Sequence, residues 1–295
     1  MDHGNAFSLE RVGAFAHLPV MKAIGTIYLV GAGPGPVDLL TLRAARLIGD
    51  ARVIVHDGLI GPDILGLARP DARLISVAKQ RARHTLPQDD INALLVREAL
   101  AGRDVVRLKG GDPFIFGRGG EEAEAARAAG VPVEVVPGIS AANGAAAASG
   151  IALTHRDASS IVSFVAGQCK GLSEQNWSGL AGKGRTLVIY MGVSTAPQIA
   201  DKLMSDGLTP DMPVAVIENA ARPEMRVLRG LLAGLPDLVE REAVQSPALI
   251  VIGEVTARDT DPHRHPSENW DLERPAQFLE ALGPSFRWGD EESKA

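Results

Sequence analysis

The sequence contains one cysteine, Cys169, and no excess of positive charge. A single thiol forms no internal disulfide and no cysteine-based zinc site, and no partnering base can be placed beside it to make it a nucleophile. The net charge is −6, whereas proteins that bind nucleic acid through nonspecific phosphate contacts are more often basic. We therefore expect no disulfide and no nucleic-acid partner.

Long hydrophobic runs are also missing. No apolar stretch reaches the ~18–20 residues that a membrane-spanning helix needs. Residues 1–22 lack the charged start and the unbroken apolar stretch of a signal peptide. The histidines do not have the spacing of metal ligands. These absences predict a cytoplasmic protein with no membrane partner and no metal.

The sequence does contain a regular alternation of apolar runs and helical patterns. Of its 295 residues, 45% are hydrophobic and 22% are charged, an ordinary balance for a globular protein. The expected strands are 24–30, 52–55, 104–108, 131–136, 160–166, 186–191, 212–218 and 248–253. The expected helices are 39–47, with Asp38 as its capping residue, 89–100, 119–129, 140–149, 197–204 and 235–242. Strands that are apolar on both faces and alternate with helices predict an α/β fold with largely parallel sheets.

A Pro-Gly pair followed by an alanine-rich helix, near residue 140, divides this alternation into two similar halves. We expect two α/β domains, 23–139 and 140–256. A flexible lead-in, 1–22, would precede them, and a polar tail, 257–295, would follow.

The first glycine-rich segment, 31–36, follows an expected strand. Glycines there allow a tight turn and a close approach of a ligand to the backbone. One interpretation is a dinucleotide fingerprint with Asp57 as the ribose-binding acid. Against it, Pro36 stands where the third glycine would be, and Pro34 removes a backbone donor. A tight turn with no ligand is the other alternative.

The second glycine-rich segment, 109–122, reads KGGDPFIFGRGGEE and also follows an expected strand. Its glycines surround charged and aromatic side chains, which is typical of a binding loop, although a purely structural loop is the alternative. Arg118 and Glu121 are three residues apart and can share a helix face. A solvated surface pair is the alternative for these two.

A group of basic residues stands out on this acidic chain. Its members are Lys79, Arg81, Arg83, His84, His155 and Arg156. Guanidinium groups suit carboxylates because two N–H bonds can run in parallel. The group indicates a polyanionic substrate, and an exposed basic loop is the alternative.

Taken together, these segments resemble the tetrapyrrole methylase family, and within it the uroporphyrinogen-III C-methyltransferases. The matching segments are 30–35, 38–42, 84–88, 91–92, 105–122, 137–140, 153–156 and 252–255. The resemblance extends over about residues 24–256, and the long run around Asp112 is its most specific part. It implies two α/β domains with the active site in the cleft between them, and a homodimer.

The resemblance also implies an activity. It implies two successive methyl transfers from S-adenosylmethionine to C2 and C7 of uroporphyrinogen III, which gives precorrin-2 by way of precorrin-1. This substrate carries eight carboxylates, which would explain local cations on an acidic chain. The cosubstrate is not phosphorylated, so prolines can replace phosphate-binding amides. Sirohaem, cobalamin and haem d1 all branch from precorrin-2, and the sequence leaves the three routes open.

The resemblance finally assigns site residues. For the cosubstrate they are Pro34, Gly110, Gly111, Asp112, Ile115, Phe116, Ser140, Ala141, Met191, Asn219, Ala220 and Ala248. Asp57 and Lys79 match positions proposed as proton acceptor and donor, and Arg118, Glu121 and Arg156 match positions that face the tetrapyrrole. We expect Arg118 to anchor the macrocycle. Asp57, Arg118 and water stay open as the proton acceptor.

Some positions depart from the family pattern. Ser140 stands where Thr is common and keeps the hydroxyl, whereas Ala220-Ala221 replaces a common Gly-Thr. Two rival functions stay open. One is a nicotinamide-dependent oxidoreductase, which would use the first glycine-rich segment and Asp57. The other is a noncatalytic module that binds a tetrapyrrole.

Overall fold

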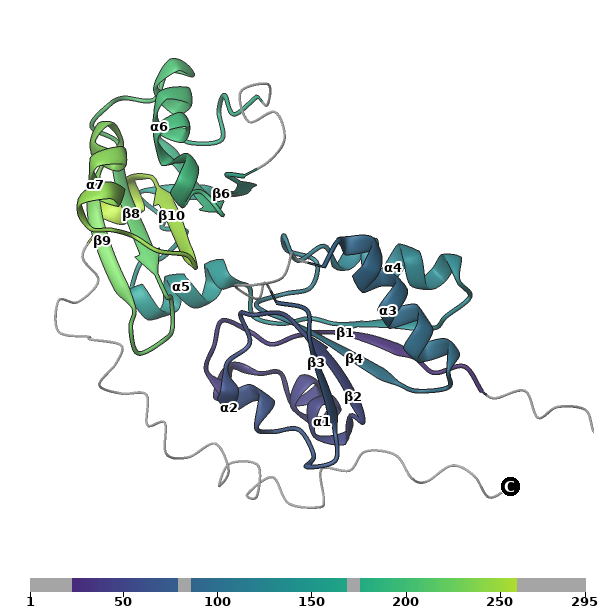
Figure 1. The fold of residues 1–295 in the computed structure, drawn as a ribbon. Coiled ribbons are helices and arrows are strands. Elements are labelled where there is room, and N and C mark those ends of the chain that lie inside the picture. The colour runs from purple at the N-terminus through teal and green to yellow at the C-terminus, as the bar shows by residue number, and fades with distance from the viewer. Residues whose placement is uncertain (1–22, 79–85, 169–175, 259–295) are drawn as a thin grey trace, which may run out of the picture.

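A computed structural model describes residues 23–78, 86–168 and 176–258. In this part of the chain, two five-stranded sheets form separate lobes, each covered by helices (Figure 1). The two lobes confirm the predicted α/β architecture. The domain bounds at 139/140 stay a prediction. The expected lead-in and nearly all of the expected polar tail lie outside the described residues.

The first sheet is entirely parallel, in the order β3-β2-β4-β1-β5. Its strands are β1 (Ile27–Gly31), β2 (Val53–His56), β3 (Arg73–Ser76), β4 (Val105–Lys109) and β5 (Val133–Val136). Every residue of the central strand β4 is buried, as expected for a strand covered on both faces. The parallel register places Gly31 beside Lys109. The glycine-rich segments after β1 and β4 therefore leave the sheet side by side, at the C-terminal ends of its strands.

Helices cover both faces of this sheet. They are α1 (Leu42–Asp50), α2 (Pro62–Leu65), α3 (Gln88–Leu100) and α4 (Gly119–Ala128). Apolar residues of α1 and α2 pack with Ile54 and Leu108 on one face, and those of α3 and α4 pack with Leu29 and Val55 on the other. Figure 1 shows the same division, with α3 and α4 on the side opposite α1 and α2.

The predicted capping residue of the first helix is wrong. Asp38 lies in a short 3-10 helix (Val37–Leu39), and α1 begins at Leu42. Thr41 is the N-cap, because its hydroxyl accepts a 3.1 Å hydrogen bond from the Ala44 backbone N–H. Asp and Thr are both good N-cap residues. Because the chain forms a separate 3-10 turn at Asp38, the α-helix begins later, after Thr41.

The second sheet has the order β6-β7-β10-β8-β9. Its strands are β6 (Ser159–Ala166), β7 (Gly184–Tyr190), β8 (Pro213–Glu218), β9 (Arg226–Leu231) and β10 (Ala248–Ile252). Only β6 and β7 pair in parallel, so the expectation of two largely parallel sheets is wrong for this half. The link between β8 and β9 holds no helix to carry a crossover, so the chain returns antiparallel.

Three helices flank the second sheet: α5 (Ala141–Ser149), α6 (Ala196–Ser205) and α7 (Leu235–Arg241). Residues of α6 and α7 pack on one face, and Ala142 and Ala145 of α5 pack on the other. Figure 1 shows α5 on the side of this sheet that faces the first lobe. Within the described ranges, no helix is both long and apolar enough to cross a bilayer.

Candidate active site

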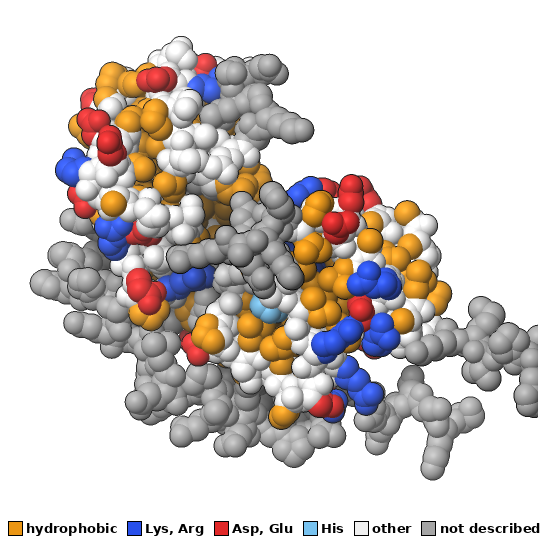
Figure 2. Space-filling model, viewed as in Figure 1, with side chains coloured by type: hydrophobic (Ala, Val, Ile, Leu, Met, Phe, Trp, Pro, Cys, Tyr) orange, Lys and Arg blue, Asp and Glu red, His pale blue; other side chains and the backbone are white. Residues whose placement is uncertain are grey.

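A cavity of about 500 Å³ lies between the two lobes. One side of its lining comes from the segments that follow β1, β2 and β4, where the parallel strands end. The other side comes from the ends of β7 and β8 and the start of β10. Figure 2 shows apolar side chains on the parts of both lobes that face each other. The cavity is therefore formed by segments distant in sequence.

Backbone rather than side chains forms part of the cavity wall. Gly33 and Gly111 exchange two backbone hydrogen bonds of 3.1 and 2.7 Å, and both have φ +68°. Behind them, a Cβ on Gly138 would lie 2.3 Å from the Gly111 carbonyl oxygen. These positions need glycine because two turns and a third segment meet in backbone contact.

The first glycine-rich segment does not meet a helix N-terminus. The 3-10 helix lies between Gly35 and α1, and the Thr41 side chain already caps α1. A dinucleotide fingerprint instead places the pyrophosphate on the N-terminus of the helix that follows its glycines. The structure therefore argues against the dinucleotide interpretation.

Asp112 holds the second glycine-rich segment in place. Its Oδ1 accepts a 2.8 Å hydrogen bond from the Phe114 N–H, and its Oδ2 accepts a 3.0 Å bond from the Gly138 N–H. The segment then turns sharply, because Phe116 and Arg118 adopt left-handed conformations with φ 54° and 58°. Such strained non-glycine residues cluster at functional sites. Asp112 thus fixes the loop that presents Arg118 to the cavity.

Phe116 and Tyr190 connect the two lobes across the cavity. Their ring centroids are 4.7 Å apart. The Tyr190 hydroxyl accepts a 3.0 Å hydrogen bond from the Ala142 N–H at the start of α5, and burial raises the pKa of Tyr190. The tyrosine therefore joins β7, α5 and the second glycine-rich segment.

Arg118 and Glu121 form the pair that their spacing predicts. Nε and Nη2 of Arg118 donate to the two carboxylate oxygens of Glu121 over 2.8 and 2.7 Å. The hydrogen bonds raise the pKa of Arg118 and lower the pKa of Glu121. Both side chains are half exposed, so the pair adds little to stability. Arg118 stays a cation, which suits an anchor for an anion and does not suit a base.

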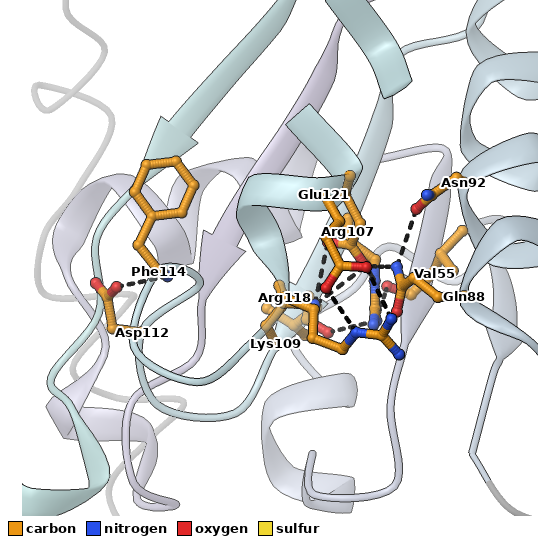
Figure 3. A network of polar contacts seen from close by, with 11 residues as sticks. Val55, Gln88, Asn92, Arg107, Lys109, Asp112, Phe114, Arg118 and Glu121 are labelled. Atoms are coloured by element: carbon orange, nitrogen blue, oxygen red, sulfur yellow. Dashed lines mark hydrogen bonds and ion pairs between the residues drawn. The ribbon is translucent and has the colours of Figure 1, made fainter. Parts of the chain in front are cut away.

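A buried cluster of three charges lies behind the same loop. Arg107 Nε and Lys109 Nζ contact the Glu122 carboxylate over 2.9 and 3.1 Å, and the three residues are 4%, 3% and 1% exposed. Figure 3 shows Arg107, Lys109 and Gln88 converging beside Arg118. Burial, and then the charge of Arg107, lower the pKa of Lys109.

Most of the expected site residues meet in this cavity. Those that line it are Pro34, Asp57, Gly110, Gly111, Asp112, Ile115, Phe116, Arg118, Ala141, Met191, Ala220 and Ala248. Glu121 is bonded to Arg118, Ser140 caps α5 through a 3.3 Å bond from the Asn143 N–H, and Asn219 adjoins Ala220. Arg156 is exposed after α5 and is not among the lining residues.

The expected basic group is only partly visible. Lys79, Arg81, Arg83 and His84 lie outside the described residues, as does Cys169. His155 and Arg156 are described, and Nδ1 of His155 lies 3.9 Å from Oδ2 of Asp157. No group of three or more His, Cys, Asp or Glu side chains that could hold a metal occurs in the described ranges.

Several polar lining residues were not expected from the sequence. They are Gln88, Arg107, Lys109, Tyr190 and Arg222. Arg107 and Lys109 did carry a signal, since they alternate in an otherwise apolar strand and so point to one side of the sheet. Tyr190 and Arg222 had no such signal in the sequence. They belong to the second lobe and reach the cavity only because the two lobes lie together in the folded protein.

Comparisons with known proteins agree with this geometry. The sequence profile of the tetrapyrrole (corrin/porphyrin) methylases matches residues 26–236. The siroheme synthase of Gluconacetobacter diazotrophicus is 53% identical over 233 residues, which are 78% of this chain and 50% of that protein. The chain thus spans about half the length of the curated relatives that it matches.

Solved structures match over most of their length. The uroporphyrin-III C-methyltransferase of Thermus thermophilus in complex with S-adenosylhomocysteine is 39% identical. The match covers 79% of this chain and 99% of that one, with a TM-score of 0.68. The native form of the Thermus enzyme, also 39% identical, gives a TM-score of 0.67 and covers 78% of this chain and 93% of that one. The chain belongs to the tetrapyrrole (corrin/porphyrin) methylase family.

Proposed function

We propose that this protein transfers methyl groups from S-adenosylmethionine to C2 and C7 of uroporphyrinogen III, giving precorrin-2 by way of precorrin-1. One observation carries the proposal: the cavity between the lobes gathers the glycine-rich backbone, Asp112 and Arg118. It does so in a chain 39% identical to a uroporphyrin-III C-methyltransferase that binds S-adenosylhomocysteine.

The lining suits the chemistry of S-adenosylmethionine. The Gly33–Gly111 pair exposes backbone to the cavity, and Ile115, Ala141 and Met191 supply apolar contacts for adenine and thioether. The Asp112 oxygens keep lone pairs beyond their two backbone bonds, so they can accept from the ligand. The bound cosubstrate would supply a sulfonium methyl group to an electron-rich pyrrole carbon. We assign Ser140, Asn219, Ala220 and Ala248 to the same site.

The protein would act chiefly by alignment. Holding the two reactants in line supplies much of the rate in such a transfer. Arg118 lines the cavity as a permanent cation and would anchor a carboxylate of the tetrapyrrole, with Glu121 fixing its orientation. Arg156 would contact the same substrate from outside the cavity.

A proton must leave the tetrapyrrole after each methyl transfer. Asp57 lines the cavity, and its Oδ1 accepts a 3.0 Å hydrogen bond from the Leu59 N–H. We assign the proton acceptor to Asp57, directly or through water, because the raised pKa of Arg118 keeps that residue protonated. Lys79 would be the donor that matches it. We also propose a homodimer in the cytoplasm, and light scattering of the purified protein would test the dimer.

Anaerobic incubation with uroporphyrinogen III and S-adenosylmethionine, followed by mass spectrometry of the tetrapyrrole, tests the function. The proposal predicts a gain of two methyl groups. A gain of one would restrict the activity to a single transfer. No gain with S-adenosylhomocysteine binding intact would point to another tetrapyrrole or to a noncatalytic module. No gain and no binding would contradict the proposal altogether.

A further inference from the structure

Four cations line the cavity in the described part of the chain: Arg107, Lys109, Arg118 and Arg222. The first two share the Glu122 carboxylate, and Arg118 is bonded to Glu121. Arg222 differs from them. Its Nη2 donates a 2.8 Å hydrogen bond to the Leu59 carbonyl oxygen, a neutral acceptor. Among the described residues, its charge is therefore the one in the lining that no carboxylate offsets.

Arg222 reaches the cavity from the second lobe and contacts the first. It belongs to the link between β8 and β9, and Leu59 follows β2, 163 residues earlier in the chain. A Cβ on Gly35 would lie 3.3 Å from Arg222 Cγ, so the aliphatic part of the arginine packs on the first glycine-rich segment. The guanidinium is thus held between the segments that carry Pro34 and Asp57.

The backbone before Arg222 is arranged to point it there. Asn219 and Ala221 both have positive φ, 48° and 60°, a conformation that costs energy for residues other than glycine. The Arg222 N–H closes this turn with a 3.0 Å bond to the Asn219 carbonyl oxygen. The strain is retained in a segment whose Ala220 lines the cavity, which indicates a use for the turn.

The two carboxylates that line the cavity, Asp57 and Asp112, accept hydrogen bonds from backbone and form no ion pair with Arg222 among the described residues. Asp57 Oδ1 accepts from the Leu59 N–H, on the residue whose carbonyl Arg222 contacts. Both oxygens of Asp112 accept from backbone N–H groups. A guanidinium has five N–H donors, and the described residues engage one of those of Arg222, so a bidentate face is left for an anion.

We infer that Arg222 binds a carboxylate of the ligand that fills this cavity. The inference rests on the proposed function, because both reactants carry such a group. S-adenosylmethionine has a carboxylate at its amino-acid end, and the tetrapyrrole has carboxylate side chains. The bond to Leu59 would then link occupancy of this subsite to the segment that carries Asp57.

The test compares Arg222→Gln, Arg222→Lys and a control, Glu224→Gln, in the full chain. Glu224 is exposed on the same link and is not among the cavity-lining residues. Calorimetry measures binding of S-adenosylhomocysteine and of 5′-methylthioadenosine, which lacks the amino-acid carboxylate. Steady-state assays give KM for uroporphyrinogen III and kcat. Circular dichroism and thermal melting confirm that each variant is folded.

We expect Arg222→Gln to weaken one carboxylate ligand by about 10- to 100-fold, as loss of a charge-assisted hydrogen bond does. Weaker binding of S-adenosylhomocysteine with unchanged 5′-methylthioadenosine assigns the subsite to the cosubstrate. A raised KM for uroporphyrinogen III with unchanged cosubstrate binding assigns it to the tetrapyrrole. Arg222→Lys should retain part of the affinity, and Glu224→Gln should match the wild type.

Two results overturn the inference while leaving the proposed function intact. One is a folded Arg222→Gln protein with wild-type Kd and KM values. The other is an equal loss of S-adenosylhomocysteine and 5′-methylthioadenosine binding, which would mean that Arg222 only supports the shape of the cavity. A wild-type protein that binds neither reactant would contradict the proposed function and the inference together.

Discussion

Lys109 on β4 and Glu122 on α4 form a 3.1 Å ion pair inside the protein, directly behind the loop that presents Arg118. Arg107 contacts the same carboxylate, so one buried anion serves two buried cations. The pair joins the central strand of the first sheet to the helix that starts at the end of the loop. It therefore connects the stability of the lobe to the geometry of the candidate active site.

Replacing the shared anion should be costly. Glu122→Gln keeps the size of the side chain and leaves Arg107 and Lys109 buried without a counter-charge. We expect the free energy of unfolding to fall by about 3–5 kcal/mol, measured by urea denaturation. Glu121→Gln, on the preceding residue, is the matched control. It breaks the half-exposed Arg118–Glu121 pair, which should lower the free energy of unfolding by less than about 1 kcal/mol. Equal losses in the two variants would contradict the role of the buried cluster.

The stability of the protein should depend on pH through Lys109. Burial lowers its pKa in the folded protein below the ordinary value of 10.5, so above the folded pKa the unfolded chain binds more protons. The free energy of unfolding should therefore gain from this group as pH rises from the folded pKa toward 10.5. Lys109→Met removes the titration and should flatten the pH dependence in that window. An unchanged slope in denaturation curves at several pH values would contradict the assignment.

The backbone contact at Gly138 should tolerate no side chain. In Gly138→Ala, the new methyl would meet backbone of Gly111 and Gly31 at 2.3 and 2.9 Å. We expect a loss of about 1–3 kcal/mol in stability and at least about tenfold weaker binding of S-adenosylhomocysteine, because the cavity wall shifts. Gly120→Ala in α4 is the control, since nothing lies within 4 Å of its Cβ and alanine favours helix by about 1 kcal/mol. Normal ligand binding by Gly138→Ala would exclude this wall from the site.

The Tyr190 hydroxyl should stabilise the folded protein by accepting a hydrogen bond at the start of α5. Tyr190→Phe keeps the ring that contacts Phe116 and removes the acceptor of the Ala142 N–H, which is buried. We expect the free energy of unfolding to fall by about 1–3 kcal/mol. Phe164→Leu is a suitable comparison because it changes a ring contact without removing a hydrogen bond. The ring centroids of Phe164 and Tyr190 are 5.9 Å apart. A Tyr190→Phe protein as stable as the wild type would mean that the amide finds another acceptor.

The sequence predicted the buried strands well because they contain short runs of β-branched residues, such as 53–55 in β2 and 105–106 in β4. It missed β3 and β9, each of which is one of the two edge strands of its sheet. β3 is largely exposed and β9 is mostly half-buried, and arginines interrupt the apolar residues of both, so neither has a long apolar run to detect. Strand direction in the second sheet was wrong, because the alternation pattern does not record which way a strand returns.

The glycine-rich segments of the site were predictable because glycines that follow two strands allow tight turns and a close approach of a ligand to the backbone. The charged pair Arg118–Glu121 was predictable from helical spacing. Arg222 was not, because its side chain bonds to Leu59 and packs beside Gly35, both in the other lobe, and no local pattern joins these residues. The contribution of the second lobe to the cavity thus required the folded structure.

We propose that one cavity holds the cosubstrate on its glycine-rich wall and the tetrapyrrole on Arg118. The most direct measurement is calorimetric binding of S-adenosylhomocysteine to Arg118→Ala beside its rate of uroporphyrinogen III methylation. We expect Arg118→Ala to bind S-adenosylhomocysteine with wild-type affinity and to lose turnover, and Arg118→Lys to keep partial turnover. Unchanged turnover in Arg118→Ala, or loss of both binding and turnover in a folded protein, would contradict this proposal.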